Sequence, residues 1–380
     1  MDALTTPSNW QRVRLGDIAE IIGGGTPSTQ VASFWNGSIN WFTPTEIGIT
    51  KYVYKSQRTI TPLGLKKSSA KLLPIGTILL TSRASIGDCA ILKVVATTNQ
   101  GFQSLIPLEK INNEFLYYLM LTLKNKLLKL ASGSTFLEVS PNKIKNLLIP
   151  LPPLNEQIAI ANILSDVDHY LYNLDALILK KESVKKALSF ELLSQRKRLK
   201  GFNQNWQRVR LGDICEITTG SLDANEMVHY GKYRFYTCAK EYYFIDKYAF
   251  DTEAILISGN GAYVGYVHYY KGKFNAYQRT YVLDNFSEHI IFVKYFLTMF
   301  LQSHIQTNRN EGNTPYIVMA TLKDFEIFLP PLNEQIAIAN ILSALDNEIT
   351  SLKNKKRQFE NIKKALNHDL MSAKIRVLKN

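Results

Sequence analysis

Two long segments of the chain carry hydrophobic residues at alternating spacings of four and three, which is the pattern of a coiled-coil seam. The first segment starts after Pro152 and Pro153 and has no proline or glycine before Gly201, so about 46 residues can be helical. At about 1.5 Å per residue this helix would be roughly 70 Å long, too long for burial in one small domain. The seam positions are Ile160, Leu164, Val167, Leu171, Leu174, Ile178, Lys181, Lys185, Leu188 and Leu192 in the first segment, and Ile338, Leu342, Leu345, Ile349, Leu352, Lys356, Phe359, Lys363, Leu366 and Leu370 in the second. We predict that the two segments cover each other's hydrophobic stripe.

Two sequence motifs each occur twice. The motif WQRVRLGDI begins at Trp10 and again at Trp206, an offset of 196 residues. The motif LPPLNEQIAIANILS spans Leu151–Ser165 and, unchanged, Leu329–Ser343, an offset of 178 residues. The segment between the motifs is therefore 18 residues shorter in the second copy. The repeat predicts two half-proteins in tandem, each a variable globular region followed by a fixed helix.

This repeat predicts an α+β protein in four parts. They are residues 1–150 (head 1), 151–200 (a long helix), 201–328 (head 2) and 329–380 (a second long helix). Two like halves pack most economically about a pseudo-twofold axis, which makes the helices an antiparallel intramolecular coiled coil and carries the heads to opposite ends. The alternative is that each helix packs on its own head.

Both heads are predicted to be mixed α/β structures. Short β-rich runs broken by glycine or proline precede one helical stretch in each head. The expected strands lie in 71–82 and 89–95 of head 1 and in 252–258, 262–270 and 279–284 of head 2, and the expected helices are 114–130 and 290–306.

The composition is that of a folded protein with an anionic partner. The 380 residues allow two or three domains, and 45 Lys and Arg against 32 Asp and Glu give a net charge of +13, which favours nucleic acid. Residues 1–200 hold 24 basic and 14 acidic side chains, whereas residues 201–328 hold 12 and 13. Head 2 would therefore need a local basic patch to contact the same polyanion.

The sequence has no signal for membrane insertion, secretion or metal binding. No apolar run approaches the roughly 18 residues of a membrane helix, so we expect a cytoplasmic protein with no membrane partner. Three cysteines far apart in the sequence support neither a disulfide framework nor a four-ligand zinc site. The six histidines form no HExxH or other ligand spacing, so we predict no metal site.

The WxxVxLGDI openings, the repeated LPPLNEQIAIANILS and the two long helices resemble the specificity subunit of type I DNA restriction-modification systems over the whole chain. The resemblance implies two target-recognition domains that each read one half of a split, asymmetric double-stranded DNA sequence. It implies that the helices set the spacer between these halves. It also implies assembly with two adenine-N6 methyltransferase subunits and with restriction (translocase) subunits. S-adenosylmethionine and ATP are expected on those partners, with no cofactor on this chain.

The residues themselves are consistent with a non-catalytic chain. The sequence has no GxxxxGK[ST] phosphate loop and no Asp/Asn-Pro-Pro-aromatic tetrapeptide of the kind that base-flipping methyltransferases use. We therefore predict no catalytic residue. Two other functions stay open at this point: a self-contained DNA methyltransferase or nuclease, and a coiled-coil scaffold that binds only proteins.

Candidate DNA contacts in head 1 combine base-reading side chains with phosphate-binding groups. A glycine-rich segment offers close backbone approach and small hydroxyls, or is a plain turn. Arg83 could pair with guanine or form a surface salt bridge, and the amides could pair with adenine or cap a turn. The lysines could contact phosphates or form a solvated face. The candidates are Gly24, Gly25, Thr26, Ser28, Lys51, Lys66, Lys67, Arg83, Asn99 and Gln100.

Candidate DNA contacts in head 2 are assigned by position relative to head 1. Asn260 lies in a glycine-rich turn at the position that Arg83 has in head 1, and Gln278–Arg279 precede a strand as Asn99–Gln100 do. The candidates are Thr219, Ser221, Lys240, Asn260, Gln278 and Arg279. Because the heads are the variable part of the family, no base contact can be carried over from it.

The repeated helix starts are candidate contacts with a partner that is present twice. Two identical methyltransferase subunits on a pseudo-symmetric scaffold would fit an identical motif. The alternative is that these residues cap the helix starts. The candidates are Asn155, Glu156, Gln157, Asn333, Glu334 and Gln335.

Overall fold

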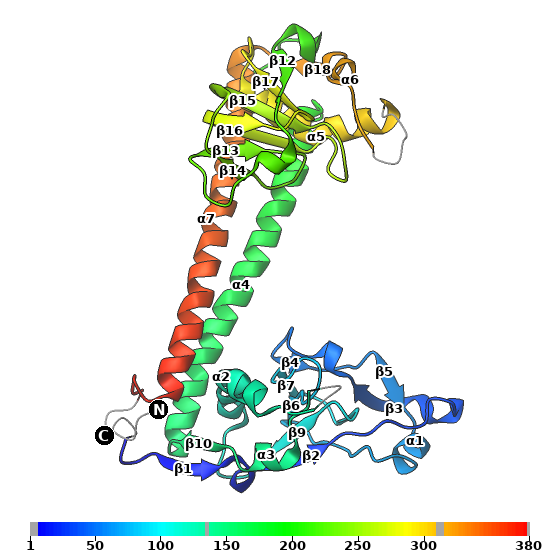
Figure 1. Cartoon of the computed structure of the whole chain (residues 1–380), viewed down its shortest axis with the longest axis vertical. Coiled ribbons are helices and arrows are strands. Elements are labelled where there is room, and N and C mark those ends of the chain that lie inside the picture. The colour runs from blue at the N-terminus through cyan, green and yellow to red at the C-terminus, as the bar shows by residue number, and fades with distance from the viewer. Residues whose placement is uncertain (1–6, 134–136, 309–314, 378–380) are drawn as a thin grey trace. The chain divides into compact units, whose positions relative to one another are not determined.

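A computed structural model describes residues 7–133, 137–308 and 315–377 of the chain. The chain divides into two compact units. Unit 1 consists of residues 1–175 and 355–380, and unit 2 consists of residues 176–354. Each unit contains one head and a part of each long helix (Figure 1). No helix in the described ranges is long and apolar enough to cross a lipid bilayer.

The long helices are α4 (Leu154–Leu193) and α7 (Leu332–Met371), each of 40 residues. Helix α4 is shorter than the predicted 46 residues because the chain leaves the helix before Gly201. Gln195 adopts a left-handed φ of 60°, and Lys197 N donates to Glu191 O over 3.0 Å. Ala373 has the same role after α7, with φ 58°. A left-handed residue of this kind ends many helices, but it is usually glycine.

Glycine at these two helix ends is expected to stabilise the protein. The left-handed conformation costs a residue with a Cβ about 1 kcal/mol, and glycine adopts it without this penalty. Gln195→Gly should raise the unfolding free energy of unit 2, and Ala373→Gly that of unit 1, each by up to about 1 kcal/mol. Thermal and urea unfolding would check this. Gln204→Gly, outside these turns, is the control, and an equal gain there would contradict the explanation.

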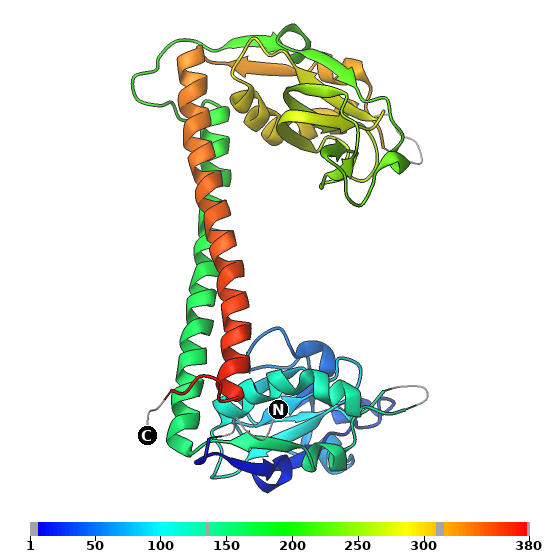
Figure 2. The ribbon, with the colours of Figure 1, turned by 60° about the vertical axis from the view of Figure 1, so that its left-hand side comes forward.

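The two long helices pair in antiparallel fashion within each unit, as predicted (Figure 2). In unit 1, Lys356 forms an ion pair with Asp175 at 2.6 Å, and Lys363 with Asp168. In unit 2, residues later in α4 likewise face residues earlier in α7. The ion pairs there are Lys181–Glu348 at 2.8 Å, Lys353–Glu182 at 2.5 Å and Lys185–Asp346. The lysines that interrupt the hydrophobic seam therefore each meet an acidic residue of the opposite helix.

Head 1 contains three sheets, with strand orders β2-β9-β6-β7-β4, β5-β3-β8 and β1-β10. Its helix α2 matches the predicted helix at 114–130 and packs on β6 and β7 (Figure 1). The strands are β1 (Gln11–Arg14), β2 (Ala19–Gly23), β3 (Trp35–Phe42), β4 (Tyr52–Val53), β5 (Arg58–Ile60), β6 (Ile78–Leu80), β7 (Cys89–Leu92), β8 (Ala96–Thr98), β9 (Gln103–Pro107) and β10 (Leu148–Leu151), and the helices are α1 (Pro62–Lys66), α2 (Asn113–Leu130) and α3 (Pro141–Lys145).

Head 2 contains a six-stranded sheet of order β12-β17-β15-β16-β13-β14 and the pair β11-β18. The predicted strand at 262–270 is wrong over its first half, because residues 262–266 form a turn and the strand begins at Val267. The strands are β11 (Gln207–Arg210), β12 (Glu216–Thr219), β13 (Tyr233–Tyr236), β14 (Tyr243–Ile245), β15 (Phe250–Ser258), β16 (Val267–Ala276), β17 (Thr280–Asp284) and β18 (Glu326–Leu329), and the helices are α5 (Ile290–Asn308) and α6 (Met319–Lys323).

The two heads share one topology. Phe42 O and Tyr236 O accept equivalent backbone hydrogen bonds, from Asn99 N and Tyr277 N. Strand β16 is equivalent in position to β7 and β8 together, so head 2 has one continuous strand where head 1 has two. The segment between β3 and β6 is longer than its counterpart and carries β4, β5 and α1, which accounts for almost all of the 18-residue difference.

The two repeated motifs of each half pair with each other. Strand β1 belongs to the WQRVR motif and is antiparallel to β10, which leads into LPPLNEQ. Strands β11 and β18 repeat this pairing. Leu15 and Leu211, which follow β1 and β11, are fully buried in the two main cores. The fixed motifs therefore form the base on which each variable head is built.

Candidate nucleic-acid interface

Three loops of head 1 meet where β2 and β6 end and β9 begins, at one edge of the sheet. These are Gly24–Thr26, Ser82–Arg83 and Asn99–Gly101, and they carry most of the predicted base-reading residues of head 1. Ser82 N donates to Gly101 O over 2.8 Å, and Thr26 Oγ1 donates to Gln100 Oε1. We call this edge the three-loop edge. The fold thus brings together side chains that are up to 74 residues apart.

Close backbone packing explains the glycines of the first loop. A Cβ at Gly24 would lie 1.9 Å from Asn99 O, so only glycine fits there. Gly25 is buried, and its Cβ would lie 2.4 Å from Ala70 N. Asn99 Oδ1 accepts a hydrogen bond from Gly101 N at 2.8 Å and so shapes its own loop. Thr26 and Gln100 are the exposed members of this group.

Arg83 combines the two roles considered from the sequence. Its guanidinium forms a salt bridge with Glu138 at 2.8 Å, and the side chain is still 43% exposed. An exposed pair of this kind contributes at most about 1 kcal/mol, so a stronger anionic or guanine partner can replace it. The contact of Arg83 with DNA stays a prediction.

Head 2 has the same three-loop edge built from different side chains. A Cβ at Gly220 would lie 1.9 Å from Ala276 O, as at Gly24 in head 1. Gln278 N donates to Leu222 O, and Gly259 N donates to Arg279 O, both over distances between 2.8 and 2.9 Å. Asn260 forms a β-bridge with Tyr316, as Arg83 does with Glu138. Thr219 and Ser221 flank Gly220 and are exposed.

The other predicted phosphate contacts lie in different places. Lys51 Nζ forms an ion pair with Glu114 at 2.5 Å and hydrogen bonds with Tyr118 and Ser165 at 2.9 Å, and its side chain is only 11% exposed. Lys51 therefore joins head 1 to α4, and in this conformation its ammonium is not available to a phosphate. The remaining ones are exposed: Lys66 and Lys67 at the end of α1, Ser28 in the glycine-rich loop, and Lys240, which lies over the Tyr263 ring.

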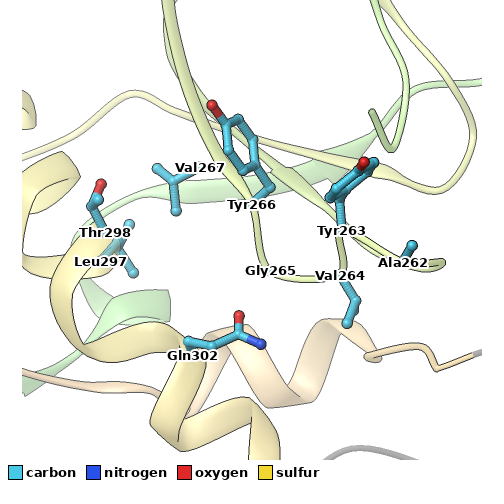
Figure 3. Close-up of a pocket in the computed structure, with 9 residues that line it drawn as sticks. All are labelled: Ala262, Tyr263, Val264, Gly265, Tyr266, Val267, Leu297, Thr298 and Gln302. Carbon is cyan, nitrogen blue, oxygen red and sulfur yellow. The ribbon is translucent and has the colours of Figure 1, made fainter. Parts of the chain in front are cut away.

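A pocket of about 340 Å³ opens in head 2 between α5 and the turn that follows Asn260 (Figure 3). Tyr263 and Tyr266 line it from the turn, and Gln302 lines it from α5. In head 1 the corresponding turn is packed against Lys124 of α2, which forms an ion pair with Asp88 at 2.5 Å. In head 2 the turn packs in the same way against α5, where Gly265 meets Gln302 and Ile305, so the surfaces next to the two edges differ in the side chains that meet the turn.

Metal ligands and cysteine thiols form no further candidate site among the described residues. These residues contain no group of three His, Cys, Asp or Glu side chains that could hold a metal ion. All three cysteines are free thiols, and burial raises the pKa of Cys89 to about 12. Cys215 and Cys238 are only partly buried.

Each head is joined to the helical pair by the same three side chains. Tyr118 and Lys363 both bond to Asp168 in unit 1, and Tyr295 and Lys185 both bond to Asp346 in unit 2. Burial and the hydrogen bond to the carboxylate raise the pKa of both tyrosine hydroxyls. Burial alone would raise the pKa of Asp346, but the hydrogen bonds from Lys185 and Tyr295 outweigh it and hold that pKa below its usual value.

This joint predicts a loss of stability in acid. Because the pKa of Asp346 is lower in the folded than in the unfolded state, its contribution is complete above about pH 4 and declines as the pH falls through the folded pKa. We expect the stability difference between wild type and Asp346→Asn to shrink from pH 6 to pH 3. Denaturant unfolding followed in unit 2 measures it. A difference that grows toward low pH would contradict the assignment.

The predicted partner residues divide into two groups. Asn155 and Asn333 are exposed, and their contact with a partner stays a prediction. The other four, Glu156, Gln157, Glu334 and Gln335, are each only 1% exposed. Gln157 accepts from Asn112 N at the start of α2, and Gln335 accepts from His289 N before α5. Gln157 thus joins the start of α4 to the start of α2, and Gln335 joins the start of α7 to the start of α5. This structural role resembles the capping alternative.

The buried glutamates are paired with arginines that sequence reasoning missed. Arg376 Nε donates to Glu156 Oε1 and Arg198 Nε to Glu334 Oε1, both over 2.8 Å. Trp10 Nε1 also donates to Glu156, over 3.1 Å. The two arginines lie 178 residues apart, which is the offset of the LPPLNEQ motif. Extending the repeat search past the helices would have found them.

Comparison with known proteins agrees with this architecture. Residues 7–181 and 203–361 both match the family model for the type I restriction modification DNA specificity domain. The chain is 31% identical over 363 residues to the MjaIX type I restriction enzyme specificity subunit of Methanocaldococcus jannaschii, covering 86% of this chain and 84% of that protein. It is 39% identical over 163 residues to the EcoDI specificity subunit of Escherichia coli, covering 42% and 35%. The crystal structure of a type I S subunit from M. genitalium aligns over 96% of both chains with a TM-score of 0.63 and 18% identity. The chain therefore belongs to the family of type I restriction-modification DNA specificity subunits.

Proposed function

We propose that each head reads one half of an asymmetric, two-part DNA sequence, and that the chain directs the other subunits of a cytoplasmic type I restriction-modification complex to it. The observation that carries this proposal is the three-loop edge. Both heads present exposed polar side chains on equivalent loops, but most of these side chains differ between the heads. In this role the chain binds DNA, and the methyltransferase and restriction subunits supply S-adenosylmethionine, ATP and the catalytic residues.

Mapping of N6-methyladenine tests this function. We expect DNA from cells that carry the chain with its methyltransferase subunit to be methylated at one split sequence, with a marked adenine in each half. A continuous motif, or unchanged marks when the chain is absent, would contradict the proposal. Turnover of DNA by the purified chain alone would favour the enzyme alternative. Absence of a DNA footprint from the assembled complex would favour the scaffold.

We also propose that the paired helices set the gap between the two half-sequences. Their antiparallel ion pairs fix the register of α4 against α7 in each unit. Insertion of seven residues into both helices, after Asp175 and after Asn354, would keep the seam pattern and lengthen both helices by about 10 Å. The same two half-sequences with a longer gap are expected. An unchanged gap with full activity would contradict this role.

The repeated helix starts carry a hydrophobic surface that fits a partner present twice. Leu154 and Ile158 on α4 are 45% and 42% exposed, and their counterparts Leu332 and Ile336 on α7 are 51% and 39% exposed. Each pair is spaced by four residues and so lies on one face of its helix, beside an exposed asparagine. We propose that each surface binds one methyltransferase subunit.

Charge substitutions can separate the two docking surfaces. Ile158→Asp and Ile336→Asp should each reduce the complex from two methyltransferase subunits to one, and the double variant should bind none, because a carboxylate in an apolar interface is costly. Native mass spectrometry counts the subunits. Leu179→Asp is the control, since Leu179 is 64% exposed and its counterpart on α7 is Arg357. Two bound subunits in the double variant would move the interface elsewhere.

A further inference from the structure

We infer that Gln100 and Gln278 occupy the same recognition position in the two heads and read the same base, adenine, in their two half-sequences. This inference rests on the proposed function, since it requires that the heads read DNA. The sequence alone pairs Asn99–Gln100 with Gln278–Arg279, which sets Asn99 opposite Gln278. The structure shifts this correspondence by one residue.

The strand register gives the correspondence directly. Gly23 and Thr219 are equivalent because they follow the WQRVRLGDI motif at the same distance, 196 residues apart. Gly23 pairs with Gln103 across β2–β9, and Thr219 pairs with Tyr281 across β12–β17. Counting three residues back from each partner leads to Gln100 in head 1 and to Gln278 in head 2.

Backbone hydrogen bonds on both sides confirm that these positions match. The preceding residue donates to the end of a parallel strand, from Asn99 N to Phe42 O over 3.0 Å and from Tyr277 N to Tyr236 O over 2.9 Å. The following residue, Gly101 or Arg279, accepts from the loop after β6 or β15 over 2.8 Å. Each glutamine is thus held between two anchored neighbours.

The two loops otherwise have no residue in common. Head 1 has Asn-Gln-Gly-Phe at 99–102, and head 2 has Tyr-Gln-Arg-Thr at 277–280. Both glutamines are exposed, so burial does not require this residue type. An amide side chain offers one acceptor and one donor that match N6 and N7 of adenine in the major groove. A shared amide on otherwise different loops therefore indicates a base that both half-sequences share.

The two amides are held differently. Thr26 Oγ1 donates to Gln100 Oε1 and so orients the amide, which still has a second lone pair on Oε1 and two N–H donors to offer a base edge. At the position equivalent to Thr26, head 2 has Leu222, which can offer only its backbone carbonyl to Gln278 N. Because orientation before binding lowers the entropic cost of recognition, discrimination by Gln100 should be the stronger.

Exchange of the amide for a carboxylate tests the inference. In the assembled complex, Gln100→Glu replaces the donor with an acceptor, and a carboxylate pairs with cytosine N4 rather than with adenine. We expect the preference for adenine at one position of one half-sequence to fall by roughly tenfold or more and cytosine to be preferred there. Gln278→Glu should do the same in the other half-sequence only. Gln30→Glu, another exposed glutamine of head 1, is the charge-matched control.

Methylation sequencing over a randomised DNA library measures all positions at once. Unchanged base preferences in both variants would overturn the inference, as would an equal loss of methylation on every sequence, which indicates a phosphate contact. A wild-type complex without any split motif would instead reject the proposed function itself. Thr26→Val gives a further readout: it should weaken discrimination at the position read by Gln100 and leave the other half-sequence unchanged.

Discussion

Replacing Gly24 with alanine is expected to disable head 1 as a DNA reader while head 2 still recognises its half-sequence. The new Cβ would lie 1.9 Å from Asn99 O and 2.4 Å from Thr98 Oγ1, closer than any real contact. The first loop must then move away from the loop that carries Gln100, which breaks the hydrogen bond from Thr26. We expect unit 1 to lose about 1–3 kcal/mol of stability. Methylation sequencing should show no base preference in one half-sequence.

Gly23, the last residue of β2 and the neighbour of this loop, provides the matched control. A Cβ there would be 3.6 Å from its nearest neighbour, the flexible end of the Gln103 side chain, and head 2 carries Thr219 at this position. Gly23→Ala should therefore keep both half-sequences and wild-type stability. Gly220→Ala should repeat the Gly24 effect in the other half-sequence, since its Cβ would lie 1.9 Å from Ala276 O. If Gly24→Ala behaves like Gly23→Ala, the close packing of the loops is not required for recognition.

The helical part of the fold was predictable because its determinants are local and periodic. The four-three spacing places Ile160, Leu164 and Leu174 on one face, and all three are buried. The lysines that interrupt this spacing were placed in the seam but given no partner, and the structure pairs Lys185 with Asp346 of the other helix. The helix end at Leu193 was not predictable, because Gln195 turns left-handed without the glycine that normally marks such a turn.

The heads were less predictable because their order depends on contacts between distant segments. The run from Ala262 reads as a strand by composition, but Gly265 at φ 80° makes its first half a turn. The pairing of β1 with β10 joins segments about 137 residues apart, and no local pattern encodes it. The repeat is nevertheless consistent with it, because the two motifs that recur in both halves are the ones whose strands pair.

The sequence was enough to predict which loops form the candidate site, but not what each side chain does there. Arg83 was predicted to be a DNA contact because it follows a strand, and Gln100 because it precedes one. The loops that carry them do meet at one edge of the sheet. Lys51 and Lys66 were both assigned to phosphate contacts, because nothing in the sequence separates their roles. Only the fold shows that Lys51 bonds to Tyr118 and Ser165 instead of facing solvent. Burial and partner identity, which decide such cases, are properties of the tertiary structure.

Removal of Arg198 or Arg376, the two arginines that pair with the buried glutamates, is expected to destabilise one unit strongly. Glu156 is 1% exposed, and Arg376→Ala would leave its carboxylate with only the Trp10 indole as a donor among the described side chains. A buried charge that loses its partner typically costs about 3–5 kcal/mol. Hydrogen exchange should therefore accelerate in β1 and β10 for Arg376→Ala, and in β11 and β18 for Arg198→Ala, which exposes Glu334 to the same loss.

A double variant separates the buried charge from the loss of packing. Glu156→Gln removes the charge, so the combination with Arg376→Ala should be more stable than Arg376→Ala alone, by a coupling energy that a double-mutant cycle measures. Lys197→Ala is the control, because this side chain is 73% exposed and its nearest acidic partner is 3.8 Å away. Additive effects of the two substitutions would mean that Arg376 acts through its packing. In that case each arginine would stabilise its helix end by packing and not by neutralising the carboxylate. The equal burial of Glu156 and Glu334 would then not be explained by the ion pair.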